Sequence, residues 1–544
     1  MTTARETQQP GIAPAGGATV EAAANAGTTK LHGRAFYESI GSPKFIVAPM
    51  VNQSEFAWRM LSRSFLSAEE KSKLLAYTPM FHARLFSQDP KYLKAHFQAT
   101  RPGATTDDGS RWLDGNPALD RPLFVQFCAN DPAHLLAAAR QVAPYCDAVD
   151  LNLGCPQGIA RKGHYGAFLQ EDQDLVFRLI NKLHTELSIP VTAKIRILET
   201  REQTLAYAQN VLKAGASILT VHGRRREQKG HLTGVADWQT LRFLRDSLPP
   251  ETVLFANGNV LQHGDVDACL AATGFDGVMS AEGNLSDPAV FATPPPAGDE
   301  GREYWRGKDG EGGWRVDAVM RRYMDIIHKY ALDAEPPARR PLFAPGDDTA
   351  WLTADGDADE GGERDPKRRK TEGGGGGEGA AAPSAKKHEA SSPNVAAMQP
   401  HLFHLLRHFV SRHTDVRDML ARARRTGVAG FEQVLDAVER RVAEGLLEYE
   451  RTGGRSFEDE VRALAARPRE TADEGESSME ALLRCKRPWW VAQPIVRPLP
   501  SEALAKGSIK LSKKELKDKA KGEDQERDKG EAVAEVAAKE AVAV

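Results

Sequence analysis

Eight short apolar segments, each followed by a helical pattern, constrain the fold of this chain more than any other feature. Most lack the alternation of polar and apolar residues that marks a half-exposed strand, so they are typical of parallel strands covered on both faces. Eight such segments in about 240 residues match a closed (β/α)8 barrel, whose usual size is about 250 residues. The predicted strands are Phe45–Ala48, Leu75–Thr78, Leu123–Phe127, Ala148–Leu153, Val191–Ile195, Ile218–Val221, Val253–Ala256 and Gly277–Met279.

Helix boundary signals between these segments agree with a barrel. Asp131 is a helix cap followed by proline, and Thr200 with Gln203 forms a capping box. An open doubly wound sheet contains similar units, but eight repeats without a GxGxxG motif after the first strand favour closure. We therefore predict an α/β fold in which residues 41–300 form a TIM barrel.

The remainder of the chain divides into helical and low-complexity parts. Apolar residues recur at helical spacing after residue 400, which predicts a smaller all-helical domain made of residues 315–332 and 397–500. Other segments are rich in Gly, Ala or charged residues and poor in large apolar ones, a composition typical of disorder. They predict a disordered N-terminus at 1–40, a disordered insert at 333–396 and a charged tail at 501–544.

Charge and cysteine spacing exclude several classes of protein. The formal net charge is −3 over 544 residues, so contact with RNA requires a local basic face. Such a face is predicted at His401–Arg425, where six Arg and four His stand against two Asp, although a basic but inert helix surface is the alternative. The five cysteines have no CxxC spacing, so we expect neither a disulfide framework nor a metal site.

Targeting signals are sparse. No apolar run approaches the ~20 residues of a membrane helix, and the first thirty residues lack a signal-peptide pattern. We expect a soluble, monomeric protein with no membrane contact that works in the cytoplasm, the nucleus or both. The basic run Lys367–Lys370 is either a nuclear signal or the basic end of an acidic linker.

Candidate functional residues lie directly after the predicted strands, because TIM barrels place their active sites at the carboxyl ends of the strands. The loops after the last two strands bear glycines, as do barrel loops that bring backbone N–H groups onto a phosphate. With no Walker or dinucleotide motif present, a mononucleotide such as FMN fits better than a tightly held NAD. Lys194 suits the polar edge of a flavin ring, where Gln126 can both donate and accept hydrogen bonds.

Cys155 follows the fourth predicted strand, within the segment Asn152–Pro156. Taken alone, a cysteine at such a position is more often an inert buried thiol. Opposite a flavin, however, a thiol that is protonated at neutral pH can act as the general acid of an ene reduction. The sequence therefore indicates a flavin-dependent reductase with Cys155 as its proton donor.

The segments around these residues resemble the tRNA-dihydrouridine synthases, in particular the eukaryotic group that acts on uridines 16 and 17 of the tRNA D-loop. The resemblance runs in order through the whole barrel. It is carried by Ala48–Arg59, Tyr77–Ala83, Val125–Asp131, Asp147–Leu169, Ala193–Arg196, Val221–Gly230, Phe255–Val260 and Ser280–Pro288.

The resemblance implies reduction of the C5–C6 bond of uridine in tRNA, with hydride from reduced flavin to C6 and a proton from Cys155 to C5. NADPH or NADH is the implied external reductant. The implied FMN ligands are Pro49, Met50, Val51, Gln126, Lys194, His222, Asn257, Gly258, Asn259, Ala281 and Glu282. The residues expected to contact tRNA are Asn152, which would orient the uracil, together with Arg84, Arg196 and Arg224.

Two positions depart from the family pattern. Arg225 stands where the family commonly has Thr, and Leu198 stands where it commonly has Gly. Both departures put RNA contacts in question more than chemistry. Two other functions stay open at this point: a flavin ene-reductase acting on a free pyrimidine or a dihydroorotate-like acid, and an inactive RNA-binding protein that kept the barrel. The arginine-rich helical region disfavours the first, and the intact Cys155 and Lys194 disfavour the second.

Overall fold

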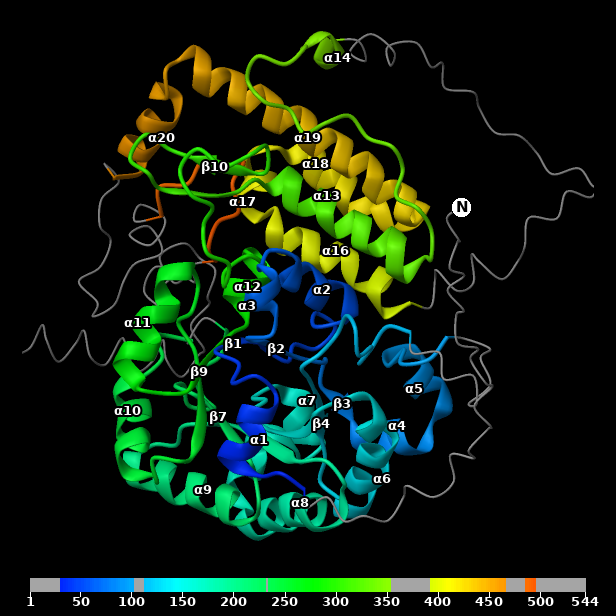
Figure 1. Ribbon diagram of the computed structural model, residues 1–544, viewed down its shortest axis with the longest axis vertical. Coiled ribbons are helices and arrows are strands. Elements are labelled where there is room, and N and C mark those ends of the chain that lie inside the picture. The colour runs from blue at the N-terminus through cyan, green and yellow to red at the C-terminus, as the bar shows by residue number, and fades with distance from the viewer. Residues whose placement is uncertain (1–29, 102–111, 231–232, 354–391, 466–484, 496–544) are drawn as a thin grey trace, which may run out of the picture.

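The core of the molecule is a closed barrel of eight parallel strands. The computed structural model, shown in Figure 1, describes residues 30–101, 112–230, 233–353, 392–465 and 485–495. Strand β1 pairs with both β2 and β9, and β2 also pairs with β4, which closes the ring. A short strand, β3 (Phe81–His82), adds to the end of β4. The barrel strands are β1 (Phe45–Val47), β2 (Leu74–Tyr77), β4 (Leu123–Cys128), β5 (Ala148–Leu153), β6 (Val191–Arg196), β7 (Ile218–His222), β8 (Val253–Asn257) and β9 (Gly277–Ser280).

All eight predicted strands are confirmed, each to within one residue at either end. The apolar runs were informative because strands such as β4, β5, β6 and β8 are buried along their entire length. The two helix starts are confirmed as well. The Asp131 carboxylate accepts from the backbone N–H of His134, and Thr200 forms a reciprocal capping box with Gln203.

Helices surround the strands and cover their outer faces (Figure 1). The longer ones are α2 (Phe56–Ser64), α6 (Pro132–Val142), α8 (Gln173–Glu186), α9 (Arg201–Lys213), α10 (Trp238–Ser247) and α11 (His263–Thr273). Shorter helices are α3 (Ala68–Lys71), α4 (Ala83–Gln88), α5 (Pro90–His96), η1 (Ala143–Tyr145), α7 (Gly158–Lys162), η2 (Gly166–Glu171) and α12 (Glu282–Ser286). No helix in the described ranges is long and apolar enough to cross a membrane.

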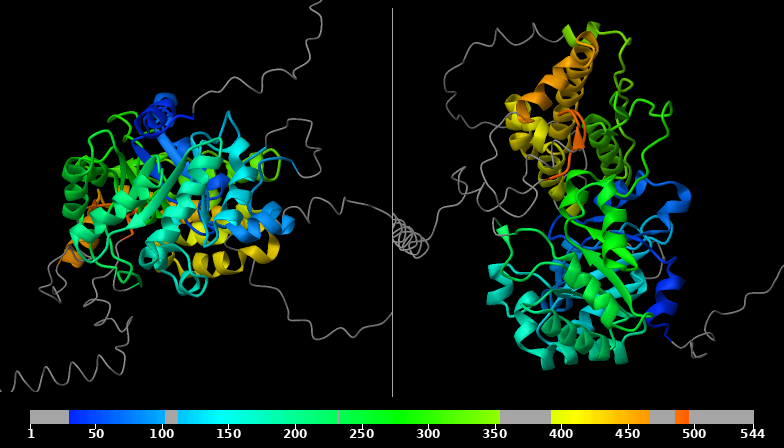
Figure 2. Two further views of the ribbon diagram at one scale, coloured as in Figure 1. Left: turned by 90° about the horizontal axis from the view of Figure 1, so that it is seen from below. Right: turned by 90° about the vertical axis from the view of Figure 1, so that its left-hand side faces the viewer.

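A second domain packs on one side of the barrel, as Figure 1 and the right-hand view of Figure 2 both show. Its helices are α13 (Val316–Ile326), η4 (Ile327–Ala331), α16 (Pro393–Leu405), α17 (Arg407–Arg412), α18 (Thr414–Arg422), η5 (Ala423–Thr426), α19 (Val428–Arg451) and α20 (Arg455–Ala465). The predicted helical domain is confirmed, and a short antiparallel pair, β10 (Tyr304–Arg306) and β11 (Gly312–Trp314), precedes it in the chain.

The structure differs from the predicted segment boundaries in three places. Helix α1 (Gly33–Ser39) lies within the predicted disordered N-terminus, and Phe36 and Tyr37 of this helix pack against the barrel rings of Phe124 and Phe255. Such a short helix is stabilised by burial and not by propensity, so composition hides it. Ordered residues also reach 353, including α14 (Ala350–Thr353), and α16 starts before 397. The run Lys367–Lys370 lies outside the described residues.

Buried polar contacts join the second domain to α2. The ring of His401 stacks on that of Trp58 at 3.9 Å, and its Nε2 lies 2.8 Å from the Glu55 carboxylate. The Asn394 amide oxygen accepts from the backbone N–H of Ala57 at 2.8 Å, in the first turn of α2. Because the first N–H groups of a helix have no partner within it, Asn394 caps α2 from the other domain.

Replacing Asn394 with Ala would leave the buried N–H of Ala57 without a partner. We expect Asn394→Ala to lower the free energy of unfolding by about 1–3 kcal/mol, measured as a lower midpoint of thermal unfolding. Asn394→Asp keeps an acceptor at the helix start and should lose less stability. Equal stability of Asn394→Ala and the parent protein would contradict capping across the domain boundary.

Candidate active site

The predicted site residues gather at the carboxyl ends of the barrel strands. A cavity of about 220 Å³ opens there. The sequence predictions that line it are Arg196, His222, Arg224, Asn257, Gly258, Asn259, Ala281 and Glu282. Gln228, Lys229 and Thr233 also line it and were not predicted. Their only signal in the sequence is that they follow His222 in the loop after a strand.

A chain of buried hydrogen bonds runs from the barrel interior to the loop that carries Cys155. The Asp150 carboxylate accepts from the Thr192 hydroxyl at 2.6 Å and from the Gln126 amide at 2.8 Å. The Gln126 oxygen accepts from the amide of Asn152 at 2.8 Å. The Asn152 oxygen accepts in turn from the backbone N–H of Cys155 at 2.9 Å. The position of Cys155 is therefore fixed through side chains on β4, β5 and β6.

Asp150 and Gln126 lie entirely inside the barrel. Burial raises the pKa of Asp150 to about 6, and the hydrogen bonds from Thr192 and Gln126 counteract this rise. The amide of Asn152 is bonded to Gln126 and to the Cys155 loop, and its predicted contact with the uracil stays a prediction.

Cys155 itself is partly exposed at the mouth, whereas the four other cysteines are buried. Burial raises the pKa of its neighbour Cys128 to about 12, so that thiol keeps its proton. On the other side of Cys155 lies Gly166, with a φ of +65°. A β-carbon at Gly166 would lie 2.8 Å from the carbonyl oxygen of Cys155 and 3.0 Å from its β-carbon. The absence of a side chain at 166 thus sets where Cys155 sits.

Lys194 brings a cation to the mouth from β6. Its ammonium donates to the Asn257 amide oxygen at 2.9 Å, and Asn257 donates to the carbonyl oxygen of Met279. Burial lowers the pKa of Lys194 to about 7, with a further decrease from Arg196. An anion bound beside Lys194 would restore its positive charge, because opposite charge favours the charged form.

The loops after β7, β8 and β9 form one wall of the mouth. The Arg224 guanidinium donates to Asn259 at 2.7 Å and lies 3.1 Å from the ring nitrogen of His222. Burial, together with Arg196 and Lys194, holds the pKa of His222 well below its usual range, so its imidazole is neutral. This wall combines a fixed guanidinium with a neutral histidine.

Two glycines allow the wall to pack closely. Gly258 has a φ of +116°, and a β-carbon there would lie 2.6 Å from that of Ala236. A β-carbon at Gly283 would lie 2.3 Å from the carbonyl oxygen of Val260. The loops after β8 and β9 are therefore in contact. Together with Lys194, these glycine loops fit a phosphate-bearing, anionic cofactor such as FMN.

Several predicted residues do not line this cavity or have other partners. Pro49, Met50 and Val51 follow the carboxyl end of β1, where Pro49 and Met50 are half-buried and Val51 is exposed. Arg196 donates to the carbonyl oxygens of Gly154 and Arg225, so it braces the mouth. Arg84 donates within α4 to Gln88, which contacts His134 of α6, so Arg84 joins the outer helices and not the mouth network.

A closed parallel barrel with a thiol, a lysine and glycine loops at its carboxyl-terminal mouth defines the class of TIM-barrel enzymes. Sequence comparison then gives the family: the family model described as "Dihydrouridine synthase (Dus)" matches residues 46–330. The chain belongs to the dihydrouridine synthase family, which confirms the resemblance found in its motifs.

Named relatives extend the match beyond the barrel. The tRNA-dihydrouridine(16/17) synthase [NAD(P)(+)] of Schizosaccharomyces pombe is 40% identical over 471 residues, covering 86% of this chain and 92% of that protein. The enzyme of the same name from Saccharomyces cerevisiae is 43% identical over 428 residues, covering 78% and 80%. A tRNA-dihydrouridine(20a/20b) synthase [NAD(P)+]-like protein of Homo sapiens is 33% identical over 250 residues, covering 45% and 70%.

Gly166 offers a test of how Cys155 is positioned. We expect Gly166→Ala to lower the thermal unfolding midpoint and to change the rate at which iodoacetamide alkylates Cys155, because the new β-carbon has a strained φ and meets Cys155. Gly158→Ala is the matched control, since a β-carbon at Gly158 meets nothing within 4 Å. Identical behaviour of the two variants would show that Gly166 does not constrain Cys155.

Proposed function

We propose that this protein reduces uridines 16 and 17 of the tRNA D-loop to 5,6-dihydrouridine, with FMN as cofactor and NADPH or NADH as reductant. The observation that carries the proposal is 40% identity across 86% of the chain to a tRNA-dihydrouridine(16/17) synthase, together with a partly exposed Cys155 at the mouth. Identity to the 20a/20b protein is lower, at 33%, and covers only 45% of the chain. The difference favours positions 16 and 17.

The residues at the mouth suit FMN. Lys194 would meet the polar edge of the ring, where a cation favours the anionic reduced form. Gln126, whose amide is bonded to Asp150 and Asn152, would support this edge from inside the barrel. The glycine loops after β8 and β9 would hold the phosphate, with Arg224 beside them. Bound there, FMN supplies the hydride for C6 of the uracil.

Cys155 would supply the proton for C5. A thiol is mostly protonated at neutral pH, and donation to C5 neutralises the negative charge that hydride addition leaves on the uracil. The bond from its backbone N–H to Asn152 holds the cysteine loop while the reaction proceeds. Because Cys155 is partly exposed, solvent can return the proton afterwards.

The uridine of the RNA must reach the mouth of the barrel. A stacked base cannot enter the barrel, so the uridine has to turn out of the loop, at a cost of a few kcal/mol that is smaller in loops. The second domain offers a basic surface for the phosphates of the RNA. The six arginines of the segment His401–Arg425 are all exposed: Arg407, Arg412, Arg417, Arg422, Arg424 and Arg425. His401, counted with them in the sequence, is fully buried and belongs to the domain contact.

The decisive experiment uses unmodified tRNA transcripts incubated with the holoenzyme and NADPH, followed by mass spectrometry of nucleosides. We expect dihydrouridine at positions 16 and 17 with the parent protein. With Cys155→Ala, product should fall by two orders of magnitude or more, which is within the usual effect of losing a general acid, about 100- to 10,000-fold. The rate at which NADPH reduces the flavin, measured from the flavin absorbance, should be unchanged in this variant. Undiminished product from Cys155→Ala would rule out its role as proton donor.

The lowered pKa of Lys194 gives a pH dependence. Lys194 is charged below pH about 7 and neutral above it, and only the charged form attracts an anionic cofactor. We expect the affinity of the apoprotein for FMN to fall between pH 7 and 9, by up to about tenfold per unit. A phosphate monoester already carries both charges in that range.

Calorimetric titration of the apoprotein with FMN measures this dependence. Lys194→Arg keeps its charge throughout and should bind FMN with an affinity that does not change with pH. An affinity of the parent protein that stays constant from pH 7 to 9 would show that Lys194 is not part of the FMN site.

A further inference from the structure

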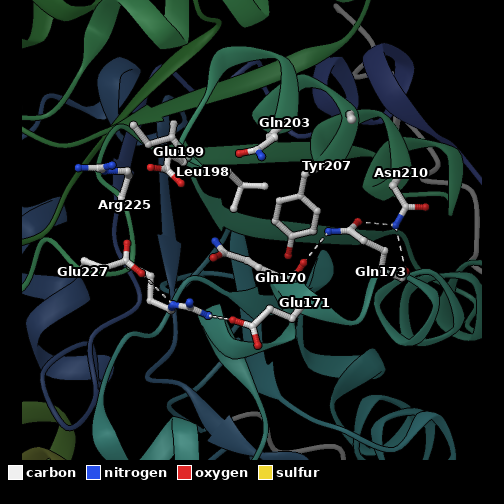
Figure 3. Close-up of a pocket in the computed structure, with 13 residues that line it drawn as sticks. Gln170, Glu171, Gln173, Leu198, Glu199, Gln203, Tyr207, Asn210, Arg225 and Glu227 are labelled. Carbon is white, nitrogen blue, oxygen red and sulfur yellow. Dashed lines mark hydrogen bonds and ion pairs between the residues drawn. The ribbon is translucent and has the colours of Figure 1, made fainter.

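A cavity of about 850 Å³ lies beside the barrel mouth (Figure 3). It lies between α9, the segment from η2 to α8, and the loops after β6 and β7. The β7 loop is shared with the mouth: the carbonyl oxygen of Arg225 accepts from Arg196, and Arg225 lines the pocket. We call this cavity the side pocket.

Two buried polar groups in the side pocket have no hydrogen-bond partner among the described residues. They are the Tyr207 hydroxyl and the amide nitrogen of Gln170, and Tyr207 is only 1% exposed. Figure 3 shows the Tyr207 ring extending from α9 toward Gln170 and Glu171. Unpartnered groups of this kind destabilise the protein, because a buried donor loses its hydrogen bonds to water without gaining others. A ligand that bonds to them would remove that cost.

Several of the other polar groups of the side pocket are bonded to one another. The Asn210 amide donates to Gln173, and Arg226 forms ion pairs with Glu171 and Glu227. Glu199 is different: it is exposed, lines the pocket, and forms no ion pair with any residue that the structure describes. The groups left for a ligand therefore include donors at Gln170 and Tyr207 and an acceptor at Glu199.

Apolar side chains complete the lining. Ile197, Leu198 and Ala206 offer surface for the face of a flat ring. Three glutamates against two arginines make the interior unfavourable for a phosphate, whereas Arg225 is exposed at the rim and suits one.

A neutral heterocycle with adjacent N–H donors and a carbonyl acceptor matches this arrangement. Guanine has that edge, with N1–H and N2–H for the carboxylate and O6 for the donors.

We propose that the side pocket binds a second unstacked base of the substrate RNA, a guanine close to the uridine that enters the barrel. The inference rests on the proposed function. Leu198 and Arg225, the two positions at which the chain departs from the family pattern, both line the pocket. The reductant is the rival occupant, and its phosphates fit the acidic interior less well.

Tyr207→Phe and Glu199→Gln test the proposal in the holoenzyme. We expect each variant to bind unmodified tRNA transcript about tenfold more weakly, the usual effect of losing one hydrogen bond in a recognition site. The rate at which NADPH reduces the flavin in the absence of RNA should not change. Tyr207→Phe should not lower the thermal unfolding midpoint, because it removes a hydroxyl that has no partner in the free protein. Glu251→Gln is the charge-matched control: it is exposed just before β8, at the opposite end of the barrel.

Inosine substitution identifies the base. Replacing the D-loop guanosines one at a time by inosine removes only the N2 amino group. At one position we expect inosine to weaken binding of the RNA to the parent protein. At the same position, inosine should not weaken binding to Glu199→Gln any further. This non-additivity is the signature of a direct pair in a double-mutant cycle. Absence of such a position would overturn the guanine assignment.

Two further outcomes would overturn the side-pocket proposal alone. One is slower flavin reduction with unchanged RNA affinity in Tyr207→Phe and Glu199→Gln, which would make the pocket a reductant site. The other is RNA affinity equal to that of the parent in both variants, with dihydrouridine still formed. If the parent protein neither binds nor modifies tRNA, the proposed function fails as well, so the two failures are distinguishable.

Discussion

The site depends on one buried carboxylate, that of Asp150. A carboxylate enclosed in a barrel must be satisfied by hydrogen bonds, because water cannot reach it. Its two oxygens accept from Thr192 and Gln126, which fixes the orientation of the Gln126 amide. That orientation leaves the Gln126 oxygen free to accept from Asn152, and Asn152 then holds the Cys155 loop. Without the Asp150 carboxylate, the Gln126 amide, the Asn152 amide and the Cys155 loop would lose their defined orientations.

The polar side chains of Asp150, Gln126 and Asn152 can lie inside the barrel because the layer below them is filled by apolar side chains. Near the amino-terminal ends of the strands the interior is filled by Phe124, Ala148, Ile218 and Val253, closed by the rings of α1. The apolar layer fixes the strands, and the polar layer above it places Lys194 and Cys155. The short helix α1 thus contributes to the site by closing the far end of the barrel.

The sequence was sufficient for the strands and for which residues meet at the mouth, because burial on both faces and position after a strand are local signals. It could not give hydrogen-bond partners. The contacts of Asn152 with the backbone of Cys155 and of Arg196 with Gly154 could not be read from the sequence, and the expected RNA contacts of both residues stay predictions. His401 looked like part of a basic face and is instead stacked on Trp58. The His401 contact joins residues more than three hundred positions apart, and no periodicity records it.

The cap of α2 has a consequence for how the protein is made. Asn394 and Ala57 are 337 residues apart, and His401 and Glu55 are 346 apart. At about 5–20 residues per second, a ribosome adds Asn394 on the order of 20–70 s after Ala57. During that time the start of α2 and the face of Trp58 have no covering domain. Folding during synthesis therefore leaves this edge of the barrel uncovered until the residues of α16 are made.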